Sequence, residues 1–133
     1  MEFNRFDILE AYMLIAIEWG EYALFDRITR KIQFHAPMLS YNGMSENARE
    51  IYHAANDKMV ARVYGVNARY MVIYNTPGYT SNDISERYTT LGEAWQGIID
   101  SVEAHDESII HMSSYMAELG DGNVYEIQVV DYA

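Results

Sequence analysis

The four histidines are the first residues to test for chemistry, because imidazole serves both as a metal ligand and as a general base. They stand at His35, His53, His105 and His111. No two of them are three or four residues apart, so the sequence offers no helical pair of metal ligands. The chain also has no cysteine, which excludes thiolate metal sites, disulfides and a cysteine nucleophile. We therefore predict surface histidines and no metal site.

Three carboxylates are the next candidates. Asp100, Glu103 and Glu107 stand at i, i+3 and i+7, and they would share one face of a helix that continued through His105. Paired catalytic carboxylates need burial and supporting partners, whereas an exposed helix face needs neither. We interpret the three as a solvated acidic stripe.

Motifs for nucleophilic catalysis and for phosphate binding are absent. The sequence contains neither G-x-S-x-G nor the loops G-x-x-x-x-G-K-[ST] and G-x-G-x-x-G. Ser113 and Ser114 lie in what we interpret as a helical pattern, with no base nearby. The sequence therefore predicts a protein that is not an enzyme and that has no cofactor.

Charge is the most informative bulk property. The 133 residues include 9 basic and 20 acidic ones, which gives a formal net charge of −11. Residues 1–69 hold eight basic and nine acidic side chains, a net of −1, whereas residues 70–133 hold one basic and eleven acidic ones, a net of −10. Such a field repels nucleic-acid phosphates and anionic membranes and attracts basic protein surfaces. The alternative is an acidic surface that only keeps the protein soluble.

One basic cluster lies in the first half of the chain, at Arg27, Arg30 and Lys31. These residues stand toward the end of a predicted helix, where positive charge complements the helix dipole, so a structural role explains them. Direct binding of nucleic acid would need a basic half, and residues 1–69 are only near neutral.

Three helices are predicted in the first half. Apolar residues recur at helical spacing over 5–19, 21–34 and 45–64, with Ser45 as the N-cap of the third helix and Gly20 and Gly65 as stop signals. The longest apolar run is too short to span a membrane, and the acidic N-terminus lacks the basic start of a signal peptide. We therefore expect a cytoplasmic protein.

The hydrophobic period changes after residue 67. Residues 68–75 (ARYMVIYN) are β-branched and aromatic and predict a buried strand. Pro77-Gly78 predicts a type II turn over 76–79, and a short strand is expected near 86–89. The loop residues 79–87 have no evident structural task and are expected to contribute to an interface. Among the twelve tyrosines, Tyr79 and Tyr41 are expected to be the most exposed.

Two helices and a strand are predicted after this loop. Thr90 and Glu93 match a capping box that begins a helix over 91–103. Apolar residues at 109, 112, 116 and 119 predict a further helix capped by Asp106, and residues 124–131 predict the last strand.

The predicted fold class is α+β, with a helical N-terminal half packed against a small β-sheet that carries two further helices. One compact domain is expected over 1–133, with a helical part at 1–66 and a strand–loop–helix–helix–strand part at 67–133.

Three stretches carry a resemblance to known proteins: RFDILEAYMLIAIEWGEY, LSYNGMSENAREIY and YMVIYNTPGYTSNDISERYTTLGEAW. Their order resembles that of small, acidic, uncharacterised proteins encoded by phages and other mobile elements, over most of residues 5–99. The resemblance implies the class of non-enzymatic inhibitors of host defence, of the anti-CRISPR or anti-restriction type. It brings no residue roles with it.

The resemblance and the acidic second half together predict an inhibitor that occupies a basic nucleic-acid-binding surface of a host protein, in the host cytoplasm. No direct contact with nucleic acid or membrane is expected. The sequence leaves open whether the protein forms a homo-oligomer. The expected binding residues are six acids and one tyrosine: Tyr79, Asp83, Glu86, Asp100, Glu103, Asp106 and Glu107. The alternative is a protein that binds or sequesters a small molecule or nucleotide, in one arrangement as a dimer with aromatic residues around a pocket.

Overall fold

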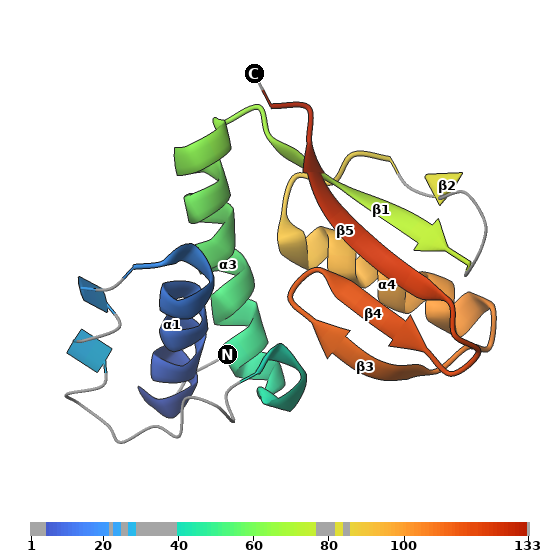
Figure 1. Cartoon of the computed structure of the whole chain (residues 1–133), viewed down its shortest axis with the longest axis horizontal. Helices are drawn as coiled ribbons and strands as arrows, with labels where there is room; N and C mark the ends of the chain where they lie inside the picture. Colours follow the sequence, from blue (N-terminus) through green and yellow to red (C-terminus); the bar gives the residue numbers. More distant parts are fainter. Residues whose placement is uncertain are drawn as a thin grey trace. The chain divides into compact units, whose positions relative to one another are not determined.

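The computed structural model describes residues 5–21, 23–24, 27–28, 40–76, 82–83 and 86–132. The chain divides into two compact units, residues 1–59 and 60–133. The fold is α+β, as the sequence predicts, since helices form the described part of the first unit and an antiparallel sheet with a helix forms most of the second (Figure 1). No helix among the described residues is long and apolar enough to cross a membrane.

The first unit contains α1 (Arg5–Trp19), the short 3-10 helix η2 (Tyr41–Gly43) and most of α3 (Glu46–Tyr64). The bounds predicted for both α-helices are confirmed. Gly20 ends α1 with φ +66° while the amide of Glu21 reaches back to the carbonyl of Ala16 at 2.9 Å, which is a Schellman stop. The helix predicted over 21–34 lies largely outside the described residues, of which 23–24 and 27–28 are helical.

Ser45 begins α3 in the predicted way. Its hydroxyl accepts a hydrogen bond from the amide of Ala48 at 3.1 Å and donates one to the buried carboxylate of Asp7 at 2.8 Å. The cap therefore ties the start of α3 to the first turn of α1. Met13 of α1 and Tyr52 of α3 are fully buried and form part of the apolar core of this unit.

A five-stranded antiparallel sheet forms the second unit, with the strands in the order β2-β1-β5-β4-β3. The strands are β1 (Arg69–Asn75), β2 (Asn82–Asp83), β3 (Ile109–Ser113), β4 (Met116–Leu119) and β5 (Val124–Val130). β1 and β5 pair along their whole length, from Arg69 opposite Val130 to Asn75 opposite Val124. Both strands were predicted, and both are confirmed.

Helix α4 (Leu91–Ala104) lies along one face of this sheet (Figure 1). The predicted inward residues are all buried: Leu91, Ala94, Trp95, Ile98 and Val102. The N-cap at Thr90 is confirmed, because the amide of Glu93 donates to the hydroxyl of Thr90 at 3.1 Å. That hydroxyl also donates to the Glu93 carboxylate at 3.2 Å. The indole N–H of Trp95 donates to the carbonyl of Ser114 at 3.0 Å, which joins α4 to the β3–β4 turn.

The helix predicted from Asp106 to Leu119 is wrong, because this segment forms the β3–β4 hairpin, so only one helix accompanies the sheet in the described residues. A bulge between Ile109 and His111 inserts one extra residue into β3. Ile109 and Met112, which are three residues apart, therefore face the same side of the sheet. That spacing is the one a helix would show, and it accounts for the Ile109–Met112 part of the wrong prediction.

Two loop predictions had different outcomes. Apart from residue 76, the turn predicted over 76–79 lies outside the described residues. The short strand expected near 86–89 is reduced to a single bridge between Tyr88 and Tyr70, and the two-residue β2 was not predicted.

Candidate ligand-binding site

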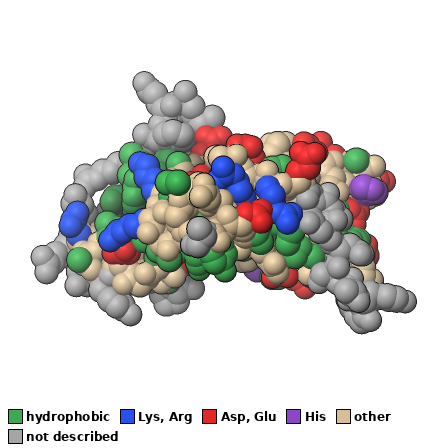
Figure 2. Space-filling model, turned by 90° about the horizontal axis from the view of Figure 1, so that it is seen from above, with side chains coloured by type: hydrophobic (Ala, Val, Ile, Leu, Met, Phe, Trp, Pro, Cys, Tyr) green, Lys and Arg blue, Asp and Glu red, His purple; other side chains and the backbone are tan. Residues whose placement is uncertain are grey.

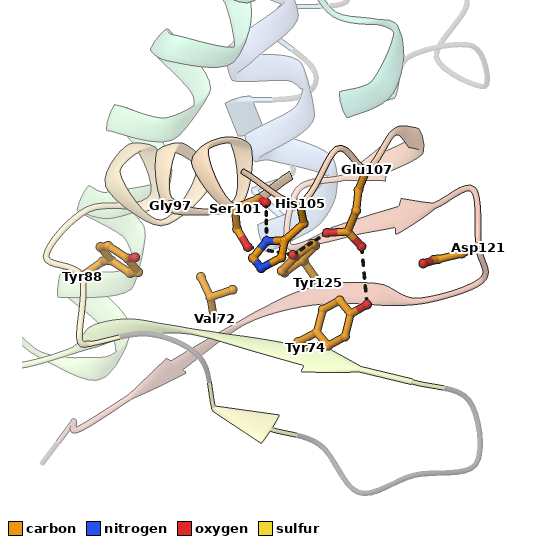
Figure 3. A pocket seen from close by; sticks show the side chains of 9 residues that line it. All are labelled: Val72, Tyr74, Tyr88, Gly97, Ser101, His105, Glu107, Asp121 and Tyr125. Atoms are coloured by element: carbon orange, nitrogen blue, oxygen red, sulfur yellow. Dashed lines mark hydrogen bonds between the residues drawn. The ribbon is translucent and has the colours of Figure 1, made fainter. Parts of the chain in front are cut away.

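A pocket of about 550 Å³ lies in the second unit, between α4 and the sheet (Figure 3). Nine residues line it: Val72, Tyr74, Tyr88, Gly97, Ser101, His105, Glu107, Asp121 and Tyr125. Pockets that hold small organic ligands span roughly 300–1,000 Å³ and combine apolar walls with a few polar groups. Both the size and the lining of this pocket meet that description.

Small residues on α4 make room for the pocket. Gly97 and Ser101 are one helical turn apart, so they stand above one another on the same face of the helix. Across from them, the buried side chain of Val72 forms the floor on β1 (Figure 3). A larger residue at either helical position would fill part of this space.

Tyr88 forms one wall of the pocket. Its backbone pairs with that of Tyr70 through two hydrogen bonds of 2.8 and 2.9 Å, which fix this segment beside β1. The Tyr88 ring points at α4, and a Cβ placed on Gly97 would lie 2.9 Å from the ring carbon Cζ and closer still to the hydroxyl oxygen. The glycine therefore permits the close approach of this ring to the helix.

Two phenols converge on the carboxylate of Glu107. The hydroxyl of Tyr125 donates to Glu107 Oε1 at 2.9 Å, and that of Tyr74 donates to Oε2 over a longer 3.5 Å (Figure 3). Tyr74 and Tyr125 are direct partners in the β1–β5 register, and their ring centres are 5.0 Å apart. The sheet register thus brings together two residues that are far apart in the sequence.

Further donors support the two phenols. The side-chain amide of Asn123 donates to the Tyr74 oxygen at 2.6 Å and to Asp121 at 2.9 Å. Ser101 Oγ lies 2.8 Å from the Tyr125 oxygen, and because the single Tyr125 proton is directed at Glu107, the serine is the donor in this pair. Every hydrogen bond of this network therefore runs toward a carboxylate.

The phenols stay protonated near neutral pH. Desolvation is the main cause that raises the pKa of Tyr74 and of Tyr125, and the negative charge of Glu107 raises both further. The fixed charges at the pocket are consequently the carboxylates of Glu107 and Asp121, and no Lys or Arg belongs to the described lining.

The surface around this unit is also acidic. Residues 60–133 hold three basic and eleven acidic side chains, a formal net charge of −8, and residues 88–133 contain no Lys or Arg at all. Acidic side chains, shown in red, reach the surface at the right of Figure 2, where a purple histidine lies beside them. This electrostatic environment disfavours anionic ligands.

The end of α4 explains how Glu107 reaches the pocket. Asp106 adopts a left-handed conformation with φ 53°, its amide bonds to the carbonyl of Glu103, and the amide of Glu107 bonds to the carbonyl of Val102 at 2.9 Å. These bonds form a Schellman motif with Asp106 in the position usually taken by glycine. The predicted stripe of Asp100, Glu103 and Glu107 is therefore wrong, because the helix ends at Ala104 and Glu107 turns inward.

The other predicted binding residues are placed as follows. Asp100, Glu103 and Asp106 are exposed on α4 and just after it, and Asp100 accepts a hydrogen bond from Gln96 at 2.9 Å. Glu86 is exposed, Asp83 belongs to β2, and Tyr79 lies outside the described residues. Among those whose side chains the structure describes, Glu107 alone lines the pocket.

Several lining residues were not predicted from the sequence. Tyr74 and Tyr125 were interpreted as ordinary strand residues, and Gly97 and Ser101 as ordinary helix positions. The available signal was the pair of small residues one turn apart on one face of the helix, which indicates room beside that face.

A second polar cluster lies inside the first unit and corrects two predictions. Tyr41 was expected to be exposed, yet only 4% of it is accessible, and His53 was expected at the surface, yet it is half-buried. The Tyr41 hydroxyl lies 2.6 Å from Nε2 of His53, and Arg49 stacks over the Tyr41 ring at 5.1 Å. Burial, and secondarily the charge of Arg49, lowers the pKa of His53 to about 4, so the ring is a neutral acceptor for the phenol.

In the described part of the chain, no group of three or more His, Asp or Glu side chains is arranged to hold a metal ion. His105 and His111 are exposed, as predicted, and His35 lies outside the described residues.

Comparison of the chain with protein-family models, with curated proteins and with solved structures gave no match. A functional conclusion therefore follows from the geometry of the pocket and from the charge of the second unit.

Proposed function

We propose that the protein is a non-catalytic binding protein whose second unit holds a small organic ligand between α4 and the sheet. The pocket of about 550 Å³, with its tyrosines and its convergent carboxylate, is the observation that carries this proposal. Such a protein would sequester or sense its ligand.

The side-chain geometry supports binding rather than catalysis. His105 contacts Ser101 through the backbone carbonyl, at 2.8 Å, and the Ser101 hydroxyl is directed at Tyr125 instead. An activated serine would need its hydroxyl directed at the imidazole. No serine–histidine pair for nucleophilic attack exists among the described lining residues.

A pocket-filling variant tests the proposal. Thermal shift followed by calorimetry would be measured with a library of small cationic, neutral and anionic molecules. Gly97→Leu places a large side chain against Tyr88 and is expected to abolish every ligand-induced shift. Gln96→Leu adds the same side chain at the neighbouring exposed position and is the matched control. Shifts that survive in Gly97→Leu would place the binding elsewhere and reject the proposal.

A second candidate function is favoured by the charge of the same unit. We infer that the exposed acids of α4 allow the protein to occupy a basic, nucleic-acid-binding surface of a host protein, as an inhibitor of host defence of the anti-CRISPR or anti-restriction type. Asp100 and Glu103 are exposed, and no basic side chain lies anywhere after Arg87. Matched potentials of this kind speed encounter and orient the partners. The host cytoplasm is the compartment that this function requires.

Charge reversal on the helix tests this candidate. Tagged wild type and the double variant Asp100→Lys, Glu103→Lys would be used for capture from a bacterial host lysate at low and high salt. A nucleic-acid-handling protein is expected with wild type at low salt, and it should be lost with high salt or with the variant. Glu107 is left intact because its reversal would also disturb the pocket. Capture that the double reversal leaves unchanged would exclude the electrostatic interface.

A further inference from the structure

We propose that the pocket selects an organic cation, namely a primary or secondary ammonium attached to an apolar body, with Glu107 as the counter-ion. This inference rests on the proposed small-ligand function and specifies its ligand class. It follows from which groups in the pocket donate hydrogen bonds and which accept them.

The donors of the pocket are already engaged. The phenols of Tyr74 and Tyr125 donate to Glu107, the Ser101 hydroxyl donates to Tyr125, and the side-chain amide of Asn123 donates to Tyr74 and Asp121. An anionic ligand needs several free donors or cations, and besides the ring of His105 the described lining residues leave it only the single O–H of Tyr88.

His105 adds an acceptor in its neutral form. Its Nδ1 lies 2.8 Å from the carbonyl of Ser101, and since a carbonyl accepts and never donates, Nδ1 carries the proton. The neutral ring then exposes the lone pair of Nε2 on the side of the pocket (Figure 3). In this form of the ring, a ligand meets an acceptor at Nε2.

Glu107 retains the capacity to bind a donor. A carboxylate offers about four acceptor positions, and the two phenols occupy one on each oxygen. The carboxylate projects between Tyr125 and Tyr74 toward the pocket (Figure 3). The N–H groups of an ammonium ion would complete its coordination with charge-assisted hydrogen bonds.

The aromatic walls suit the same ligand. The rings of Tyr74 and Tyr88 border the pocket on two sides, and an aromatic face attracts a cation within about 6 Å of its centre. The pocket of about 550 Å³ is far larger than an ammonium group, and Val72 gives it an apolar floor. The ligand is consequently an amine with an apolar or aromatic body.

Three probes with one carbon frame test charge selection. Binding would be measured by calorimetry for 2-phenylethylammonium, which is cationic, for 2-phenylethanol, which is neutral, and for 3-phenylpropanoate, which is anionic. The cation is expected to bind at least about tenfold more tightly than the alcohol, which is the effect of one good charge-assisted contact, and the anion is expected not to bind.

A conservative variant identifies the counter-ion. Glu107→Gln keeps one carbonyl oxygen, which can accept from the Tyr125 phenol, but removes the charge, so the preference for the cation over the alcohol should fall to about twofold or less. Retained binding of the alcohol by this variant shows that the pocket is still folded. Glu103→Gln removes the same charge from an exposed position four residues earlier and is expected to keep the full preference.

The outcomes separate this inference from the function on which it rests. Equal binding of alcohol and cation, or preference for the anion, would overturn the cation proposal while leaving a ligand-binding pocket. Equal loss of selectivity in Glu107→Gln and Glu103→Gln would overturn the assignment of Glu107. Failure of all three probes, together with a shift caused by a neutral or anionic library molecule that Gly97→Leu abolishes, would overturn the cation class alone. Failure of the whole library would overturn both.

Discussion

Each of the two units contains a network of tyrosine hydroxyls and a polar partner, but only the network of the second unit borders a pocket. In the first unit, Tyr41 and Tyr52 pack edge to face at 5.8 Å, and the Tyr41 phenol binds the neutral imidazole of His53 within the interior. In the second unit, the paired phenols of Tyr74 and Tyr125 bind the charged carboxylate of Glu107 at the rim of a pocket. The first network is closed and the second is open.

The helix beside each network accounts for the difference. Helix α3 presents the bulky Tyr52 and the amide of Asn56 to its neighbours, and both are fully buried. Helix α4 presents Gly97 and Ser101 at the corresponding spacing of one turn and leaves space beside them. A tyrosine-rich cluster therefore becomes a core or a pocket according to the size of the residues one helical turn apart.

The largest expected effect is on the closed network. Asn56 Oδ1 accepts from the indole N–H of Trp19 at 2.9 Å, so Asn56→Ala leaves a cavity and an unpaired donor. The variant should lose about 2–3 kcal/mol of unfolding free energy in urea. Asn123→Ala, in the open network, should lose no more than about 1 kcal/mol because water can replace the amide. Equal losses of unfolding free energy in Asn56→Ala and Asn123→Ala would contradict the distinction between a closed and an open network.

The next effect depends on pH. The pKa of His53 is lowered to about 4, against about 6.5 in an unfolded chain, so the unfolded state binds more protons between these values. The contribution of His53 to stability is complete above pH 6.5 and is lost as the pH falls. Between pH 7 and pH 5 the wild type should lose about 2 kcal/mol more than His53→Gln, whose side chain does not titrate. Parallel pH profiles in urea unfolding would show that His53 is solvated.

The smallest effect concerns the wall of the open pocket. Gly97→Ala should stabilise a helix by up to about 1 kcal/mol, but the new Cβ meets the Tyr88 ring, which must move. In a Tyr88→Ala background no ring opposes the stabilisation of the helix by alanine. A double-mutant cycle of the two substitutions should therefore show a coupling free energy of about 1 kcal/mol in stability. Ligand affinity should fall in Gly97→Ala alone. Additive effects on stability would mean that the ring shifts without cost.

Much of the fold could be predicted from local sequence patterns. The bounds of α1, α3 and α4, the caps at Ser45 and Thr90, and the strands β1 and β5 all follow from periodicity and capping chemistry within a few residues. The β3–β4 hairpin was missed partly because the bulge at Ile109 gives β3 a spacing of apolar residues like that of a helix. In addition, α4 ends at a left-handed residue, a position usually occupied by glycine, but here the residue is Asp106, so the sequence carries no stop signal.

The pocket could not be predicted, because it depends on contacts between distant residues. Tyr74 and Tyr125 meet only through the β1–β5 register, and no local pattern specifies which strands pair. Glu107 was predicted as a binding residue, but as one of the acids of the acidic second half rather than for its place beyond the helix end. The exposed acids Asp100 and Glu103 stay a prediction of an interface.

The pairing of Arg69 with Val130 has a consequence for how this unit can be rearranged. It places the start of β1 beside the end of β5, and the rings of Tyr64 and Tyr132, which flank these strands, are 4.9 Å apart. The entrance and exit of the sheet therefore adjoin one another, as in domains that tolerate circular permutation or insertion into a host loop. A short peptide joining the start of β1 to the end of β5 would make the backbone of this unit circular. New termini could then be introduced in the turn between β3 and β4.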